Sequence, residues 1–382
     1  MEVSKRIIAT SWHPGGANAI SPVIKRLNKE GKVDVITIGH QYSEKIFQDG
    51  GINYKTIDFY ELSDVSTSSM DQILQEESPD LVFTGTGVQN KYNRHVIDQA
   101  LTAVAQRRGI KSLAVSDFWD FLGNYCQRFS DIYTDNGRFR FLPDRIAIMD
   151  KLAEEAMLKE GFPREKLIIT GNPYFDELVE LKENFGERDR RKVRNDLHID
   201  LNAYLFAYFS QPIWHHYGEE LGYTEKTALK ELLDSLKKLQ DKKKIGILVK
   251  AHPRENKHDI EQVTKEYDLP IKVDQDYPTR PTILAADAII SPFSTVLIES
   301  TYLDKPTISL QPGLKKEDLL ITNRMGITVP VYEHGKIDEI LEKLLFDKNF
   351  ATELSQRAKR KGFTIDGKAT ERVTNLIYEM IK

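Results

Sequence analysis

The fold is decided by the stretch Asp287-Ala-Ile-Ile-Ser-Pro-Phe-Ser-Thr-Val-Leu-Ile-Glu-Ser-Thr-Tyr-Leu-Asp-Lys-Pro306. Its pattern predicts a buried strand, a tight polar turn and a helix that begins at Ser294. A helix that begins with small hydroxylated residues presents free backbone N–H groups and the positive end of its dipole, which suits a phosphate. Glu299 follows Ser294 by a little over one helical turn and could reach the hydroxyls of an attached ribose. We therefore interpret the stretch as a nucleotide-binding element.

Outside this stretch, short β-branched runs alternate with amphipathic segments, a pattern typical of βα units around a parallel sheet. The carboxyl ends of parallel strands share one edge of a sheet, where ligands bind. Almost every strand in the first half ends in Gly, Ser, Thr, Asp or Asn, so we expect these polar ends to line one crevice. The predicted strands are Arg6–Thr10, Val33–Ile38, Leu81–Thr84, Ser112–Val115, Arg145–Met149, Leu167–Thr170, Tyr204–Phe209, the run from Ile245, Ile271–Val273, Ala288–Ile290 and Thr307–Leu310.

The length of 382 residues exceeds a typical single hydrophobic core, so we expect two domains. A charge-rich stretch, Glu180–Asn195, is typical of a solvated helix or linker and marks the expected boundary. The predicted bounds are residues 1–180 for the first domain, 181–200 for the linker region, 201–360 for the second domain and 361–382 for a C-terminal helix.

Composition narrows the class of protein. Hydrophobic residues make up 40% and charged residues 29%, with a net charge of -4, so no basic face for nucleic acid is expected. No apolar run is long enough to cross a bilayer, and the apolar segment at the start is too short for a secretory signal. The single cysteine, Cys126, fits a reducing cytoplasm. No Cys or His spacing suggests zinc, and we expect neither a metal nor a cofactor.

Five positions in the first half are candidates for binding or catalysis. Gly15 and Gly16 let the backbone approach a ligand closely, and His13 just before them could act as a base. Asp117 and Asp120 follow a buried strand among aromatic residues, and either could take a proton from an acceptor hydroxyl. Structural alternatives carry similar weight, because a glycine turn needs no ligand and Asp117 could cap a helix.

The second half supplies the candidate donor site. A strand delivers His252 and Arg254 together, and Arg254 could contact a phosphate through two hydrogen bonds. The strand Tyr204–Phe209 runs into Gln211 in the same way. We assign to donor binding Gly15, Gly16, Gln211, Arg254, Ser291, Ser294, Thr295 and Glu299, and to catalysis His13, Asp117, Asp120 and His252.

Three motifs resemble those of the two-domain nucleotide-sugar enzymes of the GT-B fold. They are Ile169-Thr-Gly-Asn-Pro-Tyr-Phe-Asp-Glu-Leu178, Lys250-Ala-His-Pro-Arg-Glu-Asn256 and Ser291–Pro306. The chain is similar in these motifs to UDP-N-acetylglucosamine 2-epimerases, lipid-A-disaccharide-synthase-like glycosyltransferases and CDP-glycerol glycerophosphotransferases, roughly over residues 145–310. The resemblance implies an α/β protein with two Rossmann-like βαβ domains facing across a cleft and a C-terminal helix packed back toward the first domain.

By this resemblance, Ser294 and Thr295 would hold the diphosphate, Glu299 the ribose hydroxyls, and His252 would approach the phosphate or the departing oxygen. The first half departs from the epimerases, because Trp12-His-Pro-Gly-Gly16 stands where they have Arg-Pro-Glu, and Val115–Asp120 replaces their acidic turn. Transfer is therefore favoured over epimerisation.

The leading hypothesis is a metal-independent glycosyltransferase that uses a nucleoside-diphosphate sugar in surface-carbohydrate biosynthesis. The alternatives are a CDP-glycerol-type alditol-phosphate transferase, a hydrolysing UDP-N-acetylglucosamine 2-epimerase and a non-catalytic nucleotide-sugar-binding protein. The expected partners are the nucleotide-sugar donor and a carbohydrate or lipid-linked acceptor, without nucleic acid. We expect a cytoplasmic protein, and the sequence allows both a homodimer and a peripheral position at the membrane.

Overall fold

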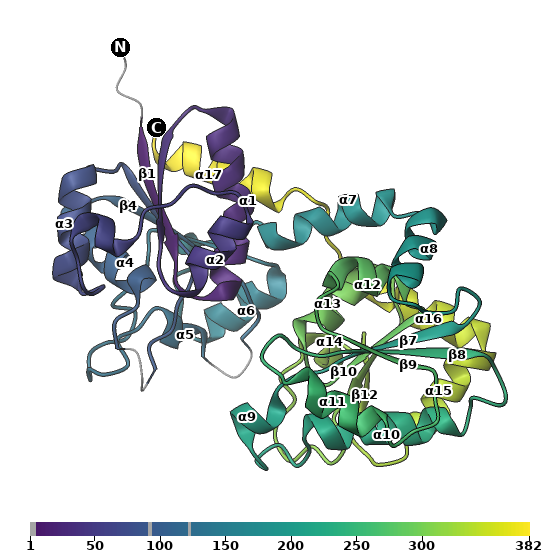
Figure 1. Ribbon diagram of the computed structural model, residues 1–382. Coiled ribbons are helices and arrows are strands. Elements are labelled where there is room, and N and C mark those ends of the chain that lie inside the picture. Colours follow the sequence, from purple (N-terminus) through teal and green to yellow (C-terminus); the bar gives the residue numbers. More distant parts are fainter. Residues whose placement is uncertain (1–4, 91–93, 121–123) are drawn as a thin grey trace. The chain divides into compact units, whose positions relative to one another are not determined.

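The computed structural model describes residues 5–90, 94–120 and 124–382. Contacts along the chain divide it into two compact units, Met1–Glu177 with Ile365–Lys382 and Leu178–Thr364. Each unit is built on one parallel sheet flanked by helices (Figure 1). The expected α/β class with two Rossmann-like units is therefore confirmed, whereas the domain bounds given above stay a prediction.

The sheet of the first unit has the strand order β2-β1-β3-β4-β5-β6, and its strands are parallel. The chain moves outward from β1 in one direction to β2 and in the other to β3, so the strand order reverses between β1 and β3. Ligands in open α/β sheets bind at such a reversal. The strands are β1 Arg6–Ser11, β2 Asp34–Gly39, β3 Leu81–Thr84, β4 Lys111–Val115, β5 Arg145–Ile148 and β6 Leu167–Ile169.

Helices cover both faces of this sheet because its strands are apolar on both faces. Ile7 and Ala9 pack into one core with α1 and α17, whereas Ile8 between them packs into a second core with α3 and α4. The helical segments are α1 Pro14–Glu30, α2 Tyr42–Asp49, η1 Ile57–Tyr60, α3 Thr67–Glu77, α4 Ile97–Arg108, α5 Tyr125–Arg128, α6 Lys151–Lys159, η2 Arg164–Lys166, η3 Pro173–Phe175 and α17 Ala369–Met380.

The C-terminal helix α17 belongs to the first unit and lies beside α1 (Figure 1). Asp176 accepts hydrogen bonds from the backbone N–H groups of Ala369 and Thr370 at 3.0 and 2.7 Å, so it satisfies free donors at the start of this helix. Arg372 donates to the Thr170 carbonyl at 2.7 Å. The expected packing of the C-terminal helix on the first domain is confirmed.

The sheet of the second unit has the order β12-β11-β10-β7-β8-β9, with its reversal between β7 and β10. Its strands are β7 Tyr204–Phe209, β8 Ile245–Lys250, β9 Ile271–Asp274, β10 Ala288–Ser291, β11 Thr307–Leu310 and β12 Val329–Val331, the last of which the sequence analysis does not predict. The helices are α7 Asp176–Asn184, which begins in the first unit, α8 Glu187–Asp196, α9 Ile213–Tyr217, α10 Glu225–Lys237, α11 Lys257–Thr264, α12 Thr279–Ala285, α13 Thr295–Tyr302, α14 Ile321–Arg324, α15 Ile337–Phe346 and α16 Lys348–Arg360.

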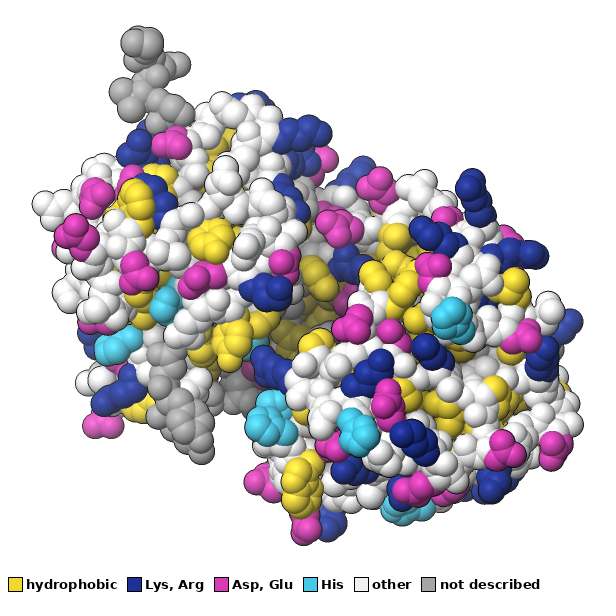
Figure 2. Space-filling model, viewed as in Figure 1, with side chains coloured by type: hydrophobic (Ala, Val, Ile, Leu, Met, Phe, Trp, Pro, Cys, Tyr) yellow, Lys and Arg dark blue, Asp and Glu magenta, His cyan; other side chains and the backbone are white. Residues whose placement is uncertain are grey.

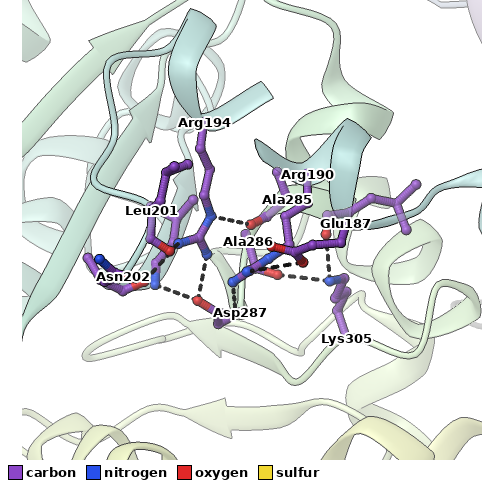
Figure 3. A network of polar contacts seen from close by, with 12 residues as sticks. Glu187, Arg190, Arg194, Leu201, Asn202, Ala285, Ala286, Asp287 and Lys305 are labelled. Carbon is purple, nitrogen blue, oxygen red and sulfur yellow. Dashed lines mark hydrogen bonds and ion pairs between the residues drawn. The ribbon is translucent and has the colours of Figure 1, made fainter. Parts of the chain in front are cut away.

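A buried ionic network fixes α8 to the second sheet (Figure 3). Arg194 is fully buried and its guanidinium contacts Asp287 Oδ2 at 2.7 Å, the Ala203 carbonyl at 2.8 Å and the Ala285 carbonyl at 3.1 Å. Arg190 contacts the other Asp287 oxygen at 2.9 Å. Residues in the expected linker region are therefore helical, and two of the arginines in its charge run anchor it to the sheet.

The visible surface carries mixed charge. In Figure 2, basic and acidic side chains are interspersed over the exposed face of each unit. This distribution matches the small net charge of -4. Among the described residues, no helix has both the length and the apolar character that crossing a membrane requires.

We predict that Arg194→Met lowers the free energy of unfolding by about 3 to 5 kcal/mol, because Asp287 would keep a partly buried charge without its main partner. Arg191→Met is the matched control, since Arg191 lies on the same helix with its side chain 63% exposed. We expect less than about 0.5 kcal/mol from this control. Urea unfolding of the three proteins measures both effects, and equal losses in the two variants would contradict the prediction.

Candidate functional site

The end of β7 meets the end of β10 at the reversal in the second sheet. The Phe293 N–H donates to Gln211 Oε1 at 2.9 Å, so the predicted donor residue Gln211 joins the two strand ends. Ser291 is fully buried, and its hydroxyl donates to the Phe209 carbonyl at 2.7 Å. Ser291 therefore holds β10 to β7, and the polar turn after it is fixed in position at the reversal.

Helix α13 begins in this turn. Ser294 is its N-cap residue, and the Ser294 hydroxyl accepts from the Val296 N–H at 3.2 Å. Thr295, the first helical residue, is exposed. The sequence analysis places the start of the helix at this same serine. The Leu297 N–H donates to the Ser294 carbonyl at 3.0 Å. The Thr295 N–H and the positive end of the helix dipole form a favourable environment for an anion.

Glu299 lies one turn into α13 and is 5% exposed. Its Oε2 pairs with Arg280 Nε of α12 at 2.9 Å. Burial raises the pKa of the Glu299 carboxyl, and the charge of Arg280 opposes this rise. Arg280 is a residue that sequence reasoning misses, because no motif connects α12 with Glu299.

A second group forms at the end of β8, where the chain turns at His252. Glu255 organises this turn: its carboxylate accepts from the His252 N–H and from the Ser210 hydroxyl, both at 2.7 Å. Because Ser210 follows β7, this carboxylate ties the ends of β7 and β8 together. Burial raises the pKa of Glu255.

His252 is held as a directed hydrogen-bond donor. Its Nδ1 accepts from the Arg254 N–H at 3.1 Å, so the neutral ring carries its proton on Nε2. Burial lowers the pKa of His252, and the positive charges of Arg254 and His216 lower it further. The neutral form is therefore favoured at pH 7, and Nε2–H is the group that can contact a phosphate oxygen. His216, which sequence analysis does not assign, joins this group from α9.

The first unit carries a separate polar group at its own strand reversal. Asp117, after β4, accepts from the Thr86 hydroxyl at 3.2 Å and pairs with Arg128 at 3.4 Å through the same Oδ1. Arg128 also donates to the Thr86 carbonyl at 3.0 Å. Asn172, from the Gly-Asn-Pro motif, donates to the Asp117 carbonyl at 3.1 Å. Arg128 comes from α5, and its spacing from Asp117 gives no sequence signal.

The glycine turns of the first unit face one another and Asp117. A Cβ atom on Gly16 would lie 2.4 Å from Ser11 Oγ and 3.2 Å from the Gly85 Cα, so α1 starts in close contact with the end of β3. A Cβ atom on Gly15 would lie 1.9 Å from Asp117 Oδ2. These glycines are therefore required by close packing within the unit, and their assignment to donor binding stays a prediction.

The other predicted first-unit residues, His13 and Asp120, have different surroundings. His13 is exposed and is the N-cap residue of α1, while its ring lies edge-on to Trp12 at 6.0 Å. Asp120 interacts electrostatically with Tyr125 and Glu160, whose pKa values are raised mainly by burial. The structure thus brings Asp117 to the start of α1. In residues 5–90, 94–120 and 124–382 no group of His, Cys, Asp and Glu side chains could hold a metal ion.

Comparison with protein families matches residues 147–379 to the model of the family described as CDP-Glycerol:Poly(glycerophosphate) glycerophosphotransferase. The match includes the donor-site residues of the second unit, whereas His13, Asp117 and Asp120 lie outside it. No curated protein matches the chain.

Solved structures share the fold at low sequence identity. UDP-GlcNAc 2-epimerase from Neisseria meningitidis bound to UDP-GlcNAc has a TM-score of 0.69 and 16% identity, over 98% of this chain and 100% of that chain. UDP-GlcNAc 2-epimerase from Methanocaldococcus jannaschii has a TM-score of 0.67 and 19% identity, over 98% and 99%. A glycosyltransferase from Rickettsia africae has a TM-score of 0.63 and 13% identity, over 99% and 98%. The expected GT-B fold is confirmed.

Asp98 gives the first unit a titration near neutral pH. This residue of α4 is 2% exposed, and its Oδ2 accepts from the Trp12 N–H at 2.9 Å, beside His13. Burial raises the pKa of Asp98 to about 6. A raised pKa means that the folded state binds this proton more tightly than the unfolded chain, so the associated stability is lost as the pH rises from about 4 through 6.

We predict that Asp98→Asn removes this pH dependence. Between pH 4.5 and 7.5, the free energy of unfolding of the wild type should fall by about 2 kcal/mol relative to that of the variant. Urea unfolding at several pH values measures the difference directly. Parallel curves for the two proteins would show that Asp98 does not titrate in this range.

Proposed function

Since the chain belongs to the CDP-glycerol:poly(glycerophosphate) glycerophosphotransferase family, we propose that it transfers glycerophosphate, or a related alditol phosphate, from a CDP-activated donor to a hydroxyl group of a surface polymer. The family match over residues 147–379 carries this proposal. The family match favours alditol-phosphate transfer, an alternative in the sequence analysis, over glycosyl transfer, which is its leading hypothesis. The acceptor is a carbohydrate or lipid-linked polymer in this proposal.

We assign donor binding to the second unit. The Thr295 N–H at the start of α13 and the side chain of Arg254 would bind the diphosphate, and Glu299 would accept hydrogen bonds from the ribose hydroxyls. His252 Nε2–H would donate to a phosphate oxygen. Preorganised donors of this kind stabilise negative charge that develops on a leaving phosphate. The neutral state of His252 and the fixed turn at Glu255 support this role.

The reaction follows from the donor chemistry. The acceptor hydroxyl oxygen attacks the phosphorus atom that carries glycerol, a new P–O bond forms, and the phosphoanhydride bond to the cytidylyl group breaks. CMP leaves with the bonding electrons, and the proton of the acceptor hydroxyl passes to a base. Asp117, at the strand reversal of the first unit, is our candidate for this base, with His13 and Asp120 as the alternatives from sequence.

The released nucleotide distinguishes the candidate functions. With CDP-glycerol and a glycerophosphate-primed acceptor, we expect the wild type to release CMP in equal amount to the glycerophosphate incorporated, measured by ion-exchange chromatography and acceptor mass. Glycosyl transfer would instead release a nucleoside diphosphate from a sugar nucleotide and require an acceptor. A hydrolysing epimerase would release UDP from UDP-GlcNAc without any acceptor, and either result in place of CMP release would overturn the proposal.

We predict that Glu299→Gln weakens donor binding 10- to 100-fold, since a hydrogen bond to a charged group contributes about 1.5 to 3 kcal/mol. The amide keeps the shape of the carboxylate and can still accept from Arg280, so the fold should survive. Glu317→Gln, an exposed carboxylate in the same unit, is the control. Calorimetric titration with CDP-glycerol measures the affinities. Unchanged affinity in a folded Glu299→Gln protein would remove the ribose assignment.

A further inference from the structure

An open groove of about 280 Å³ lies on the first unit. Helix α1 forms one wall, α2 forms the second, and the segment that follows β6 forms the third. The lining residues are Asn18, Ser21, Pro22 and Lys25 of α1, Ile46, Asp49 and Gly50 at α2, and Tyr174 and Glu177 after β6.

Two walls of this groove start at Asp117. Gly15 contacts the Asp117 carboxylate, and Asn18, Pro22 and Lys25 follow Gly15 along the same stripe of α1 at helical spacing. At about 1.5 Å per residue, Lys25 lies about 15 Å along the helix from Gly15. On the other wall, Tyr174 follows Asn172, which binds the Asp117 backbone. A linear molecule with one end at Asp117 would therefore run along the groove.

The lining suits a chain that carries both hydroxyl groups and phosphates. Asn18 offers an amide that both donates and accepts, and Pro22 and the ring of Tyr174 offer apolar surface for the carbon backbone. Asp49 is paired with Lys45 at 3.2 Å, so its charge is already balanced. Lys25 forms no ion pair with any residue that the structure describes, and its ammonium group lies over Gly50 at the groove.

Gly50 lies against this ammonium group. A Cβ atom on Gly50 would lie 3.5 Å from both Cε and Nζ of Lys25, within ordinary van der Waals contact. The lysine stem thus rests on the glycine with its charged end in the groove. The groove also contains the carboxylate of Glu177, which can accept hydrogen bonds from hydroxyl groups of a polyol chain. A phosphate of the same chain would pair with the ammonium group of Lys25, at the other end of the stripe of α1.

We propose that this groove binds the acceptor chain behind the reacting hydroxyl, with a phosphate of the chain at Lys25. The proposal rests on the proposed function for the identity of the acceptor. It deepens that function, because a binding site remote from the reacting end would let the enzyme prefer a long polymer to a single unit.

Two substitutions test the groove. Asn18→Phe fills it near Asp117, and Lys25→Gln removes the positive charge at its far end. Lys29→Gln is the matched control, since Lys29 is an exposed lysine of the same helix outside the groove. Circular dichroism checks that each variant is folded.

The kinetic comparison uses a single glycerophosphate unit and a glycerophosphate hexamer as acceptors, with CDP-glycerol as donor. For the wild type and Lys29→Gln, we expect a KM for the hexamer at least tenfold below that for the single unit. Both groove variants should raise the hexamer KM about tenfold, and for Lys25→Gln, which lies far from Asp117, kcat and the single-unit KM should change less than twofold. A hexamer KM unaffected by either substitution would overturn the proposal.

A binding measurement keeps this test separate from the proposed function. Calorimetric titration of the hexamer into the protein without donor should show binding to the wild type and to Lys29→Gln, and at least tenfold weaker binding to both groove variants. This result would support the groove even if CDP-glycerol were not the donor. A neutral trisaccharide that binds as tightly, with no effect of Lys25→Gln, would overturn the assignment of a phosphate to Lys25. Absence of hexamer binding to the wild type would overturn the groove itself.

Discussion

The reversal of strand order in each sheet is the constraint on which the candidate sites depend. A parallel sheet brings its polar strand ends to one edge, and at the reversal the connections leave in opposite directions. Backbone groups exposed there need partners, which are supplied by polar side chains such as those of Gln211 and Ser291. The start of α13 and the turn at His252 are thereby fixed before any ligand arrives.

The two units satisfy this constraint with different chemistry. In the second unit, a carboxylate, Glu255, accepts two hydrogen bonds and leaves the imidazole of His252 to face outward as a neutral donor. In the first unit, a carboxylate, Asp117, is itself the central group, held by Arg128 and the Thr86 hydroxyl. One arrangement suits the stabilisation of negative charge, and the other suits contact with a hydroxyl group. This division is consistent with donor and acceptor sites on separate units.

The sequence predicts the fold well because its signals are local. Apolar runs with polar ends indicate most strands, and Ser294 indicates the start of α13 correctly. The strand β12 lacks such a signal, since it is only three residues long and contains Pro330, as an edge strand can. The sites are predicted less completely. Arg128 and Arg280 reach their carboxylate partners from other helices, and the glycines at positions 15 and 16 signal close packing without revealing that its partners are Asp117, Ser11 and Gly85.

Because α17 packs on α1 and is capped by Asp176, the first unit consists of two chain segments, and the second unit lies between them in sequence. During translation, the ribosome completes the whole second unit before it makes α17. Until then, the surface of α1 that α17 covers stays exposed, although all strands of the first sheet are already synthesised. The connectivity of the chain thus allows the second unit to fold first. The first unit completes its core only when α17 packs on α1.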